Sequence, residues 1–564
     1  MYRISKSFRK GMDQGWEERV GTPPPWTAIG KQYHAARKER EELIANPPPI
    51  HGDARFMGRD EIRAIETEAM ALNENKFARR HGCMILGNGF DFESSELVTT
   101  VTSNPPGHLL TIAATRSGKG TSQIVPNLLL YGGSVVVIDP KGENYALTHE
   151  ERRKHGRVVR VDPFRVTKPF DPVSPFSAYN PMEFVEGESD ARRLASLLLG
   201  DGPTGESKFW HDEAVNLLSA VILACVSVER NQIGDVRDVL TASNLTNGKE
   251  PSALAKYLGA LADGSTEPGA KRRLDSFIGY AEKMQSSILA TINAGMSIWD
   301  TPEIAEAVGS TDLPFGDLKT DVATIYVVLP FDKMGDYGAF LRLMVGQFYQ
   351  AMIKGGKAES IPVACIIDEF PALGSMKELV RALAEVAGYG VRFWLFIQNH
   401  SQLKALYPDD WNAIVSQCST VSVFGVTDGE TVEWLEKQLG KKTQAVSVPG
   451  VNTGGTGRDA LGVLNVNGTV SDNVVLAGAP LLSPGEIREY LGVGSPWQLI
   501  FLSGKRPLFA ARIIYFDDDR LMGMAGSFDN PPNFAAPTDL RGTEYWKGVP
   551  EGFKYGIRDA NDDV

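Results

Sequence analysis

Residues 109–130 read LLTIAATRSGKGTSQIVPNLLL, and this stretch decides the fold. An apolar run is followed by a turn that contains Gly118 and Gly120, and then by a second run of helical character. This order binds phosphate well, because backbone N–H groups of the turn and of the helix N-terminus point at the same anion. Lys119 is placed to reach the terminal phosphates of a nucleotide.

The turn departs from the usual GxxxxGK[ST] pattern of a P-loop. Ala113 stands at the first glycine, Gly120 stands where a hydroxyl residue usually holds Mg²⁺, and Thr121 is displaced by one position. The group that binds the metal therefore stays open. On the motif alone, the alternative is a plain Gly-Lys-Gly turn between a strand and a helix. The predicted nucleotide-binding residues are Thr115, Arg116, Ser117, Gly118, Lys119, Gly120, Thr121 and Asp139.

A second apolar run ends in two adjacent carboxylates. Residues 363–369 read VACIIDE, so Asp368 and Glu369 follow a predicted strand. A buried strand delivers such side chains to the carboxyl edge of the sheet, where α/β proteins bind ligands. There Asp368 can orient Mg²⁺ and Glu369 can polarise an attacking water. Alone, the pair is also typical of a strand that ends in a solvated loop; together with Lys119 it predicts a site for ATP hydrolysis.

Two further strand ends carry polar side chains. Gln398 ends the run VRFWLFIQ, where an amide beside the γ-phosphate can respond to its presence. The alternative for Gln398 is a hydrogen bond within its own turn. Asp139 ends the strand that follows the P-loop helix, although Pro140 and Gly142 would give an ordinary turn the same appearance.

Two kinds of pattern alternate along the chain. Strands and helices alternate from about residue 109 to 163 and again after 319, which predicts an α/β domain with parallel strands buried on both faces. From Asp190 to Asp317, apolar residues recur at helical spacing without a convincing strand, so we expect an inserted all-α domain. Residues 440–480 are rich in Gly, Thr, Asn and Val, which is typical of a long flexible loop or a surface ribbon.

The predicted segments begin with a charged, proline-punctuated region. Residues 1–40 carry nine basic and four acidic side chains, so this arm could touch anionic lipid or nucleic acid, or simply be a solvated tail. The segments are a polar basic N-terminal arm (1–50), the first part of the nucleotide-binding domain (51–188), the all-helical insertion (189–318), the second part of the nucleotide-binding domain (319–519) and an irregular C-terminal tail (520–564).

Composition limits the class of protein. The 564 residues are 42% hydrophobic, enough for a large core, and the net charge of −12 argues against a surface coated in positive potential, though not against a local basic channel. Four cysteines at scattered spacings match neither a zinc site nor a disulfide framework, so we expect a reducing compartment.

The longest apolar stretch, 217–228, is shorter than the roughly 20 residues that cross a bilayer. With no signal peptide evident, we expect a cytoplasmic protein.

With these residues assembled, the chain resembles the TraG-like coupling proteins of type IV secretion and conjugation systems. The likeness runs from about His51 to Asp519. The segments that carry it are HGDARFMGRDEI from 51, TRSGKGTSQIVPNLL from 115, VIDPKGENY from 137, KFWHDEAVNLLSAVI from 208, LRLMVGQF from 341, CIIDEFPALG from 365, GYGVRFWLFIQNHSQLKALY from 388 and LLSPGEIREY from 481. So many matches in order make the resemblance specific.

The resemblance implies a RecA-like P-loop domain with an inserted all-α domain, assembled as a homo-hexameric ring with ATP at subunit interfaces. Such a ring is implied to bring DNA–relaxase complexes or effector proteins to a type IV secretion channel at the inner membrane. By motif position, Lys119 would contact the β- and γ-phosphates, and Asp368 with Thr121 would serve Mg²⁺. Glu369 would activate water and Gln398 would sense phosphate.

Two departures from the family matter. Its members usually begin with transmembrane helices, which are not evident here, so either partners dock the chain at the membrane or the chain is shortened. No motif identifies the arginine finger, a guanidinium supplied by a neighbouring subunit. Arg392 is our choice over Arg381 and Arg116, with a structural or surface salt bridge as the alternative role for Arg392.

Three functions remain open from the sequence. A DNA-coupling motor predicts ATP hydrolysis that DNA stimulates and salt weakens. A coupling ATPase for protein effectors predicts binding of secretion signals with little DNA stimulation, and the acidic charge balance supports it. A docking hub that binds ATP as a structural ligand predicts no turnover, and the pair Asp368 and Glu369 argues against it.

Overall fold

The computed structural model describes two compact units of the chain. The first comprises Met1–Arg55 and Glu433–Glu486, and the second comprises Phe56–Val432 and Ile487–Val564. Residues 1–27 of the predicted basic arm and 527–564 of the predicted tail lie outside the described residues. The described residues are 28–71, 82–203, 205, 207–241, 253–357, 361–453, 457–458, 464–465 and 468–526.

The second unit is built on an 11-stranded sheet with the order β2-β1-β15-β14-β9-β3-β8-β7-β4-β6-β5. Neighbouring strands from β9 to β5 are parallel, and the pairs from β2 to β9 are antiparallel. The strands are β1 (Met84–Asp91), β2 (Glu96–Ser103), β3 (His108–Ala113), β4 (Val135–Ile138), β5 (Arg157–Val161), β6 (Ala323–Val327), β7 (Val363–Ile367), β8 (Val391–Ile397), β9 (Cys418–Phe424), β14 (Trp497–Leu502) and β15 (Leu508–Ala511).

The parallel strands are buried on both faces. Every residue of β3, β4, β6 and β7 is buried, although successive side chains of a strand point to opposite faces, so both faces of the sheet are covered. The helices outside the insertion are α3 (Arg59–Ala71), α5 (Val125–Leu130), α6 (Glu143–His155), α14 (Met334–Lys354), α15 (Lys377–Val386), α16 (His400–Leu406), α17 (Trp411–Gln417), α18 (Gly429–Leu439), α19 (Pro484–Leu491) and α20 (Asp519–Met524).

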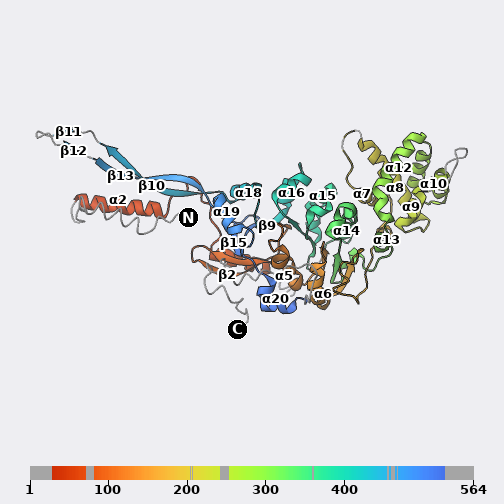
Figure 1. The fold of residues 1–564 in the computed structure, drawn as a ribbon, viewed down its shortest axis with the longest axis horizontal. Helices are drawn as coiled ribbons and strands as arrows, with labels where there is room; N and C mark the ends of the chain where they lie inside the picture. The colour runs from red at the N-terminus through yellow and green to blue at the C-terminus, as the bar shows by residue number, and fades with distance from the viewer. Residues whose placement is uncertain are drawn as a thin grey trace. The chain divides into compact units, whose positions relative to one another are not determined.

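The described residues between β5 and β6 form helices and no strand. These helices are α7 (Glu188–Leu199), α8 (Ser207–Ser227), α9 (Ile233–Thr241), α10 (Ala253–Gly264), α11 (Pro268–Ile278), α12 (Glu282–Met296) and α13 (Pro302–Ala307). α8 is the core of this insertion, because α7, α9, α10, α11 and α12 all contact it. Figure 1 shows α8, α9, α10 and α12 gathered into one group.

α8 is also the one described helix that is long and apolar enough to cross a membrane. Its most apolar 18-residue window has a mean hydropathy of 1.3, and 61% of that window is buried inside the protein. The core helix of a globular domain has the same properties, and α8 is packed as such a helix by its neighbours.

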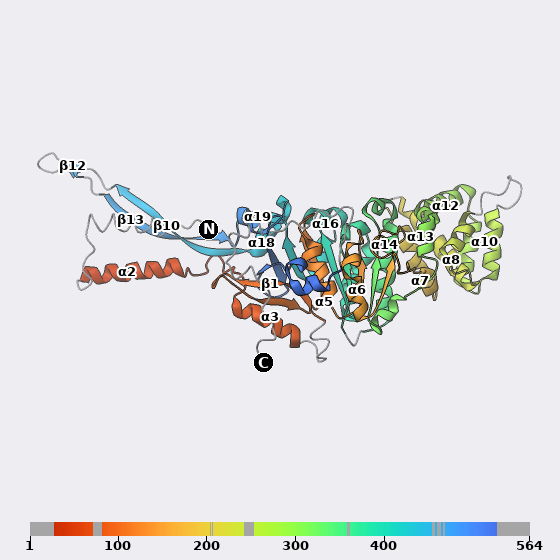
Figure 2. The same ribbon diagram turned by 60° about the horizontal axis from the view of Figure 1, so that its bottom comes forward.

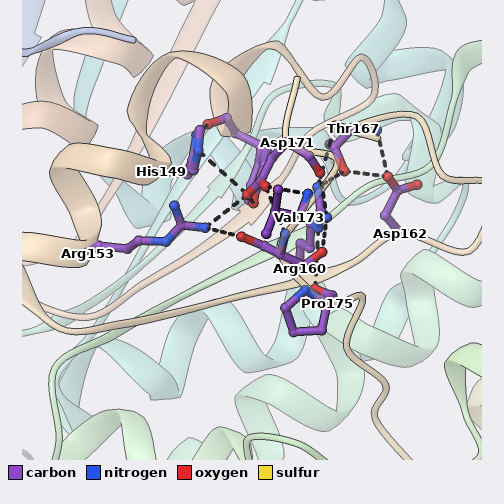
Figure 3. A network of polar contacts seen from close by, with 10 residues as sticks. His149, Arg153, Arg160, Asp162, Thr167, Asp171, Val173 and Pro175 are labelled. Atoms are coloured by element: carbon purple, nitrogen blue, oxygen red, sulfur yellow. Dashed lines mark hydrogen bonds and ion pairs between the residues drawn. The ribbon is translucent and has the colours of Figure 1, made fainter. Parts of the chain in front are cut away.

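Arg160 fastens the connection that leads from β5 to the insertion (Figure 3). Its side chain is 1% exposed, and its guanidinium donates to Asp171 O at 2.8 Å, to Thr167 Oγ1 at 3.1 Å and to Pro175 O at 3.4 Å. One buried cation thereby holds three points of a loop that would otherwise leave backbone carbonyls unpaired.

The carboxylate of Asp171 joins the same loop to α6 (Figure 3). It accepts hydrogen bonds from Tyr145 Oη at 2.7 Å, Arg153 Nη2 at 3.0 Å and Ser174 N at 2.9 Å. Burial acts to raise the pKa of Asp171, but the hydrogen bonds from Ser174, Tyr145 and Arg153 outweigh it and hold the pKa far below its usual range. The base of the insertion is therefore firmly tied to the sheet.

The first unit contains a long antiparallel ribbon and a helix. β10 (Lys441–Thr453) pairs with β13 (Gly468–Pro480) in unbroken register from Lys441↔Pro480 to Thr453↔Gly468. Of the two structures that the sequence of 440–480 suggested, the ribbon is the one formed. β11 (Gly457–Arg458) and β12 (Leu464–Asn465) make a short second pair, and α2 (Ala28–Ala45) runs along β10 (Figure 2).

Buried His108 predicts acid sensitivity of the second unit. The Nε2 of His108 lies 2.7 Å from Leu383 O, and Phe393 N donates to its Nδ1 at 3.1 Å, so the neutral ring is the form that fits. Burial lowers the pKa of His108 from 6.5 to about 4. Because the folded pKa lies below the unfolded one, this contribution to stability is present above pH 6.5 and is lost as the pH falls towards 4.

We therefore expect His108 to lower the free energy of unfolding by up to roughly 1.4 kcal/mol per pH unit across this window. Thermal unfolding of the wild type and of His108→Gln, followed from pH 7.5 to pH 4.5, checks this. The melting temperature of the wild type should fall more steeply than that of the variant, since glutamine does not titrate. Parallel profiles would contradict the assignment.

Candidate nucleotide site at the carboxyl edge of the sheet

The sheet topology brings three distant segments to one edge. β3 lies between β9 and β8, and β7 lies next to β8. In the parallel register Ile112 pairs with Ile397, and Ile367 pairs with Leu395. The turn after β3, the carboxylates after β7 and the amide after β8 therefore all emerge at the carboxyl edge, where parallel sheets bind ligands.

The turn after β3 has the backbone of an anion-binding loop. Gly118 has a φ of +86°, in the left-handed region that glycine adopts without strain, and Arg116 has a φ of +60°. Ser117 N donates to Ala114 O at 3.2 Å and closes the turn. The following helix opens with a π-helical turn, Gly120–Ile124, before α5 begins. Such turns are frequent at functional sites.

Lys119 meets both carboxylates that follow β7. Its Nζ lies 3.2 Å from Asp368 Oδ1 and 3.2 Å from Glu369 Oε2, and it donates to Asp368 O at 2.6 Å. The two segments are 249 residues apart in sequence. Burial alone would lower the pKa of Lys119, but the charges of Asp368 and Glu369 raise it, so the lysine is a cation at any physiological pH.

Gln398 completes this cluster. Its Nε2 donates to Glu369 Oε1 at 3.3 Å and to Glu369 Oε2 at 3.2 Å, while its Oε1 accepts from Thr115 Oγ1 at 2.8 Å. The amide therefore bridges the turn after β3 and the carboxylate after β7. A ligand that displaced either partner would change the hydrogen bonds of the other.

Asp139 lies behind the cluster and is 0% exposed. Its carboxyl accepts from Tyr145 N at 2.9 Å and from Asn144 Nδ2 at 3.3 Å, and the same Asn144 Nδ2 lies 3.5 Å from Asp368 Oδ2. Burial raises the pKa of Asp139 to about 8. Asn144, which the sequence reasoning did not single out, thus links Asp139 to Asp368; its only sequence signal was its place in the segment from 137.

The hydroxyls of the turn point back onto the loop. Thr121 Oγ1 donates to Gly118 O at 3.0 Å, and Ser122 Oγ donates to the same carbonyl at 2.7 Å. Arg116 is exposed, and nothing lies within 4 Å of the position that a Cβ on Gly120 would take. The predicted metal role of Thr121 therefore stays a prediction, since its hydroxyl would have to turn to meet a cation.

Arg392 is not brought to this cluster. It lies near the amino end of β8, whereas Gln398 follows the carboxyl end. Its Nε donates to Pro105 O at 2.6 Å and its Nη1 donates to Ala387 O at 3.0 Å. These carbonyls hold the guanidinium within its own subunit, which favours the structural alternative for Arg392. Its role as a finger in a neighbouring subunit stays a prediction.

Arg512 holds the turn after β3 through hydrogen bonds, and no sequence signal pointed to this residue. Its Nη1 donates to Ser117 O, its Nη2 donates to Ser495 O at 2.6 Å, and its guanidinium lies 4.8 Å from the ring centre of Phe424. Burial lowers the pKa of Arg512 to about 10. An arginine that directly follows β15 therefore holds the loop that precedes Lys119.

A cavity of about 660 Å³ opens beside Glu369 and Gln398. The helical insertion contributes Leu198 and Gly295 to its lining, and α14 contributes Arg342 among others. Glu369 and Gln398 are thus accessible from a cavity that the insertion also lines.

A glycine-containing turn, a lysine paired with two carboxylates and an amide on the adjacent strand define the class of P-loop nucleotide-binding proteins. Residues 59–533 match the family described as Type IV secretory system Conjugative DNA transfer. The chain belongs to this family, as its resemblance to coupling proteins predicted.

Curated relatives carry the names of coupling and conjugation proteins. Protein VirD4 of Rhizobium rhizogenes is 28% identical over 431 residues, which are 75% of this chain and 60% of that protein. Conjugal transfer protein TraG of Escherichia coli is 27% identical over 508 residues, which are 83% of this chain and 77% of that protein. The chain therefore spans about three fifths of the length of the VirD4 relative.

Solved structures of the conjugative coupling protein TrwB have the same fold. An unbound form of TrwB matches with a TM-score of 0.58 and 16% identity over 82% of this chain and 92% of that chain. A complex of TrwB with ADP and Mg²⁺ matches with a TM-score of 0.57 and 14% identity over 82% of this chain and 94% of that chain. The predicted fold class, a RecA-like P-loop domain with an inserted all-α domain, is confirmed.

Proposed function

We propose that this protein hydrolyses ATP with Mg²⁺ and uses the energy to deliver DNA–relaxase complexes or effector proteins to a type IV secretion channel. The observation that carries the proposal is the meeting of Lys119 with Asp368 and Glu369 at one edge of the sheet. Membership of a conjugative DNA transfer family and the ADP and Mg²⁺ bound by TrwB support the choice of substrate and metal.

The residues of the cluster divide the chemistry among them. The backbone of the turn and Lys119 would hold the β- and γ-phosphates, with Thr115 beside the terminal one. Glu369 would accept the proton of the attacking water, and Gln398 would exchange its hydrogen bond to Glu369 for one to the γ-phosphate. Such catalysis consists mainly of positioning and charge stabilisation, which suits a cluster already held by hydrogen bonds.

Asp368 fits the role of the magnesium ligand. Its Oδ1 is buried without a hydrogen-bond partner among the described residues, apart from its ion pair with Lys119. The described residues contain no group of three or more His, Cys, Asp or Glu that could hold a metal alone. Mg²⁺ commonly takes one or two carboxylates and completes its shell with phosphates and waters, so one Asp suffices. When bound, the ion neutralises developing charge on the phosphates.

Gly120→Ser tests whether the altered turn limits metal binding. There is room for the new side chain, and the φ of Gly120 lies outside the left-handed region, so we expect the free energy of unfolding to rise by roughly 0.5 kcal/mol. The added hydroxyl should lower the Mg²⁺ concentration needed for half-maximal hydrolysis. Gly259→Ser, which is equally uncrowded but lies in α10, is the control. An unchanged magnesium requirement would contradict the proposed position of the metal.

We further propose that the active form is a homo-hexameric ring docked at the cytoplasmic face of the inner membrane through channel partners. Arginine fingers in this class are supplied between subunits, so an arginine of a neighbouring subunit would complete the site in such a ring. Hydrolysis per subunit should therefore rise with protein concentration until the ring has formed.

The proposal is tested by ATP hydrolysis of the purified chain at several protein and salt concentrations, with and without single- or double-stranded DNA. We expect hydrolysis that DNA stimulates and that salt weakens. Turnover without any response to DNA would favour the effector-coupling alternative. No turnover under any of these conditions would contradict the proposal and leave the docking hub.

A further inference from the structure

The segment Glu369 to Lys377 is held at its two ends by different parts of the second unit. At one end, Glu369 is bound by Lys119 at 3.2 Å and by Gln398 at 3.2 Å, both within the nucleotide site. At the other end, Asp201 from the helical insertion accepts from Lys377 N at 3.0 Å. The nucleotide site and the insertion therefore both form hydrogen bonds with the segment 369–377.

Asp201, which belongs to the insertion, caps α15, a helix outside the insertion. Its Oδ2 also accepts from Ser375 Oγ at 2.9 Å, next to the start of α15. The first N–H groups of a helix have no partner within the helix, and a carboxylate there satisfies them and opposes the helix dipole. Asp201 lies two residues after the end of α7, and the intervening Gly200 turns the chain with a φ of +76°. Any displacement of the end of α7 would thus act on the start of α15.

The middle of the segment is held in place by hydrogen bonds and by ring stacking. Arg342 Nη1 donates to Leu373 O at 3.1 Å, and Leu373 is 0% exposed. Met376 N donates to Tyr407 Oη at 3.1 Å, and the ring of Tyr407 stacks on Phe370 with centroids 5.8 Å apart. The segment is therefore held along its length by Arg342 and Tyr407 as well as at its two ends.

α14 packs against both the insertion and the segment. A Cβ on Gly346 would come within 2.4 Å of the Leu197 side chain in α7, and a Cβ on Gly338 would come within 3.2 Å of Ala372 O. Arg342 lies between these glycines on α14, and a Cβ on Gly200 would come within 3.2 Å of its Nη2. α14 therefore packs closely against both the insertion and the segment that Asp201 joins.

We propose that Asp201 is a positioning residue that couples the helical insertion to Glu369 through the segment 370–377. This inference rests on the proposed hydrolytic role of Glu369 and adds its regulation. When the insertion moves, Asp201 releases or tightens the start of α15, and the segment shifts the carboxylate relative to Lys119 and Gln398. The insertion thereby sets the rate of hydrolysis without contact with the nucleotide.

The first test compares steady-state hydrolysis in three variants. Asp201→Ala removes the cap, and we expect kcat to fall about tenfold with KM for ATP unchanged, because the turn at Lys119 is untouched. Asp201→Asn keeps an oxygen that accepts from Ser375 and Lys377, so it should restore the wild-type rate. Asp212→Ala, which removes a carboxylate of α8 that pairs with Lys208 in the same helix, should leave both constants unchanged.

The second test does not depend on hydrolysis. In nucleotide-free protein, amides 375–380 should exchange hydrogen faster in Asp201→Ala than in the wild type, Asp201→Asn or Asp212→Ala. The inference is overturned if Asp201→Ala matches Asp212→Ala in kcat and exchange, or if Asp201→Asn is as impaired as Asp201→Ala. A wild type that never hydrolyses ATP would defeat the proposed function instead, while the exchange experiment still reports on the cap.

Discussion

Glu369→Gln is expected to lower kcat for ATP hydrolysis by about 10²–10⁴-fold while ATP still binds. Glutamine has nearly the size of glutamate and can keep a hydrogen bond to Gln398, but it cannot accept a proton from water. The carboxylate is 5% exposed and lies within 3.2 Å of both Lys119 and Gln398, so no other acid in the cluster stands in the same place. Steady-state turnover and calorimetric titration with ATP measure the two properties separately.

The matched control is Glu385→Gln, the same substitution at an exposed position of α15. It should leave turnover and binding at wild-type values. Equal and negligible turnover in the wild type and Glu369→Gln would favour the docking hub. Undiminished turnover in Glu369→Gln would show that another group activates the water.

Lys119→Ala is expected to weaken ATP binding by at least about 30-fold and to abolish hydrolysis. The Nζ of Lys119 is the cation that balances Asp368 and Glu369, and it is the group placed to meet the terminal phosphates. Without it, two largely buried carboxylates face an anionic substrate. The same loss should lower the melting temperature of the nucleotide-free protein, because a buried charge without its partner is strongly unfavourable.

Fluorescence titration with a labelled ATP analogue measures this loss. Lys154→Ala is the control, since the side chain of Lys154 is 71% exposed and pairs with Glu151 in the same helix. Lys154→Ala should bind like the wild type. Tight binding by Lys119→Ala would contradict the account of the site.

The strands that carry the site could be predicted because their sequences are largely apolar. β3, β7 and β8 are each bounded by a turn or a polar residue, and buried parallel strands have this pattern. The ends of these strands predicted the site residues: Lys119 in the turn after β3, Asp368 and Glu369 after β7, and Gln398 after β8. These side chains meet because the strand order in the sheet is β3-β8-β7. The apolar pattern of the individual strands does not determine that order.

Other features depend on packing that the sequence does not display. β1 and β2 were not predicted. The sequence of β1, MILGNGFD, contains two glycines and lacks a clear alternation of polar and apolar residues. Arg512 meets the turn at Ser117 because β15, which precedes it, returns next to β14. Arg392 was predicted as an arginine finger for a neighbouring subunit, and the structure places it near the amino end of β8, away from the edge that carries Gln398.

The most direct test of the central claim is an experimental structure of Glu369→Gln with Mg²⁺ and ATP. The account predicts the γ-phosphate in hydrogen-bond contact with Lys119 Nζ and Gln398, and the metal beside Asp368. Nucleotide bound elsewhere, or a γ-phosphate that leaves the pairs between Lys119, Asp368 and residue 369 intact, would contradict it.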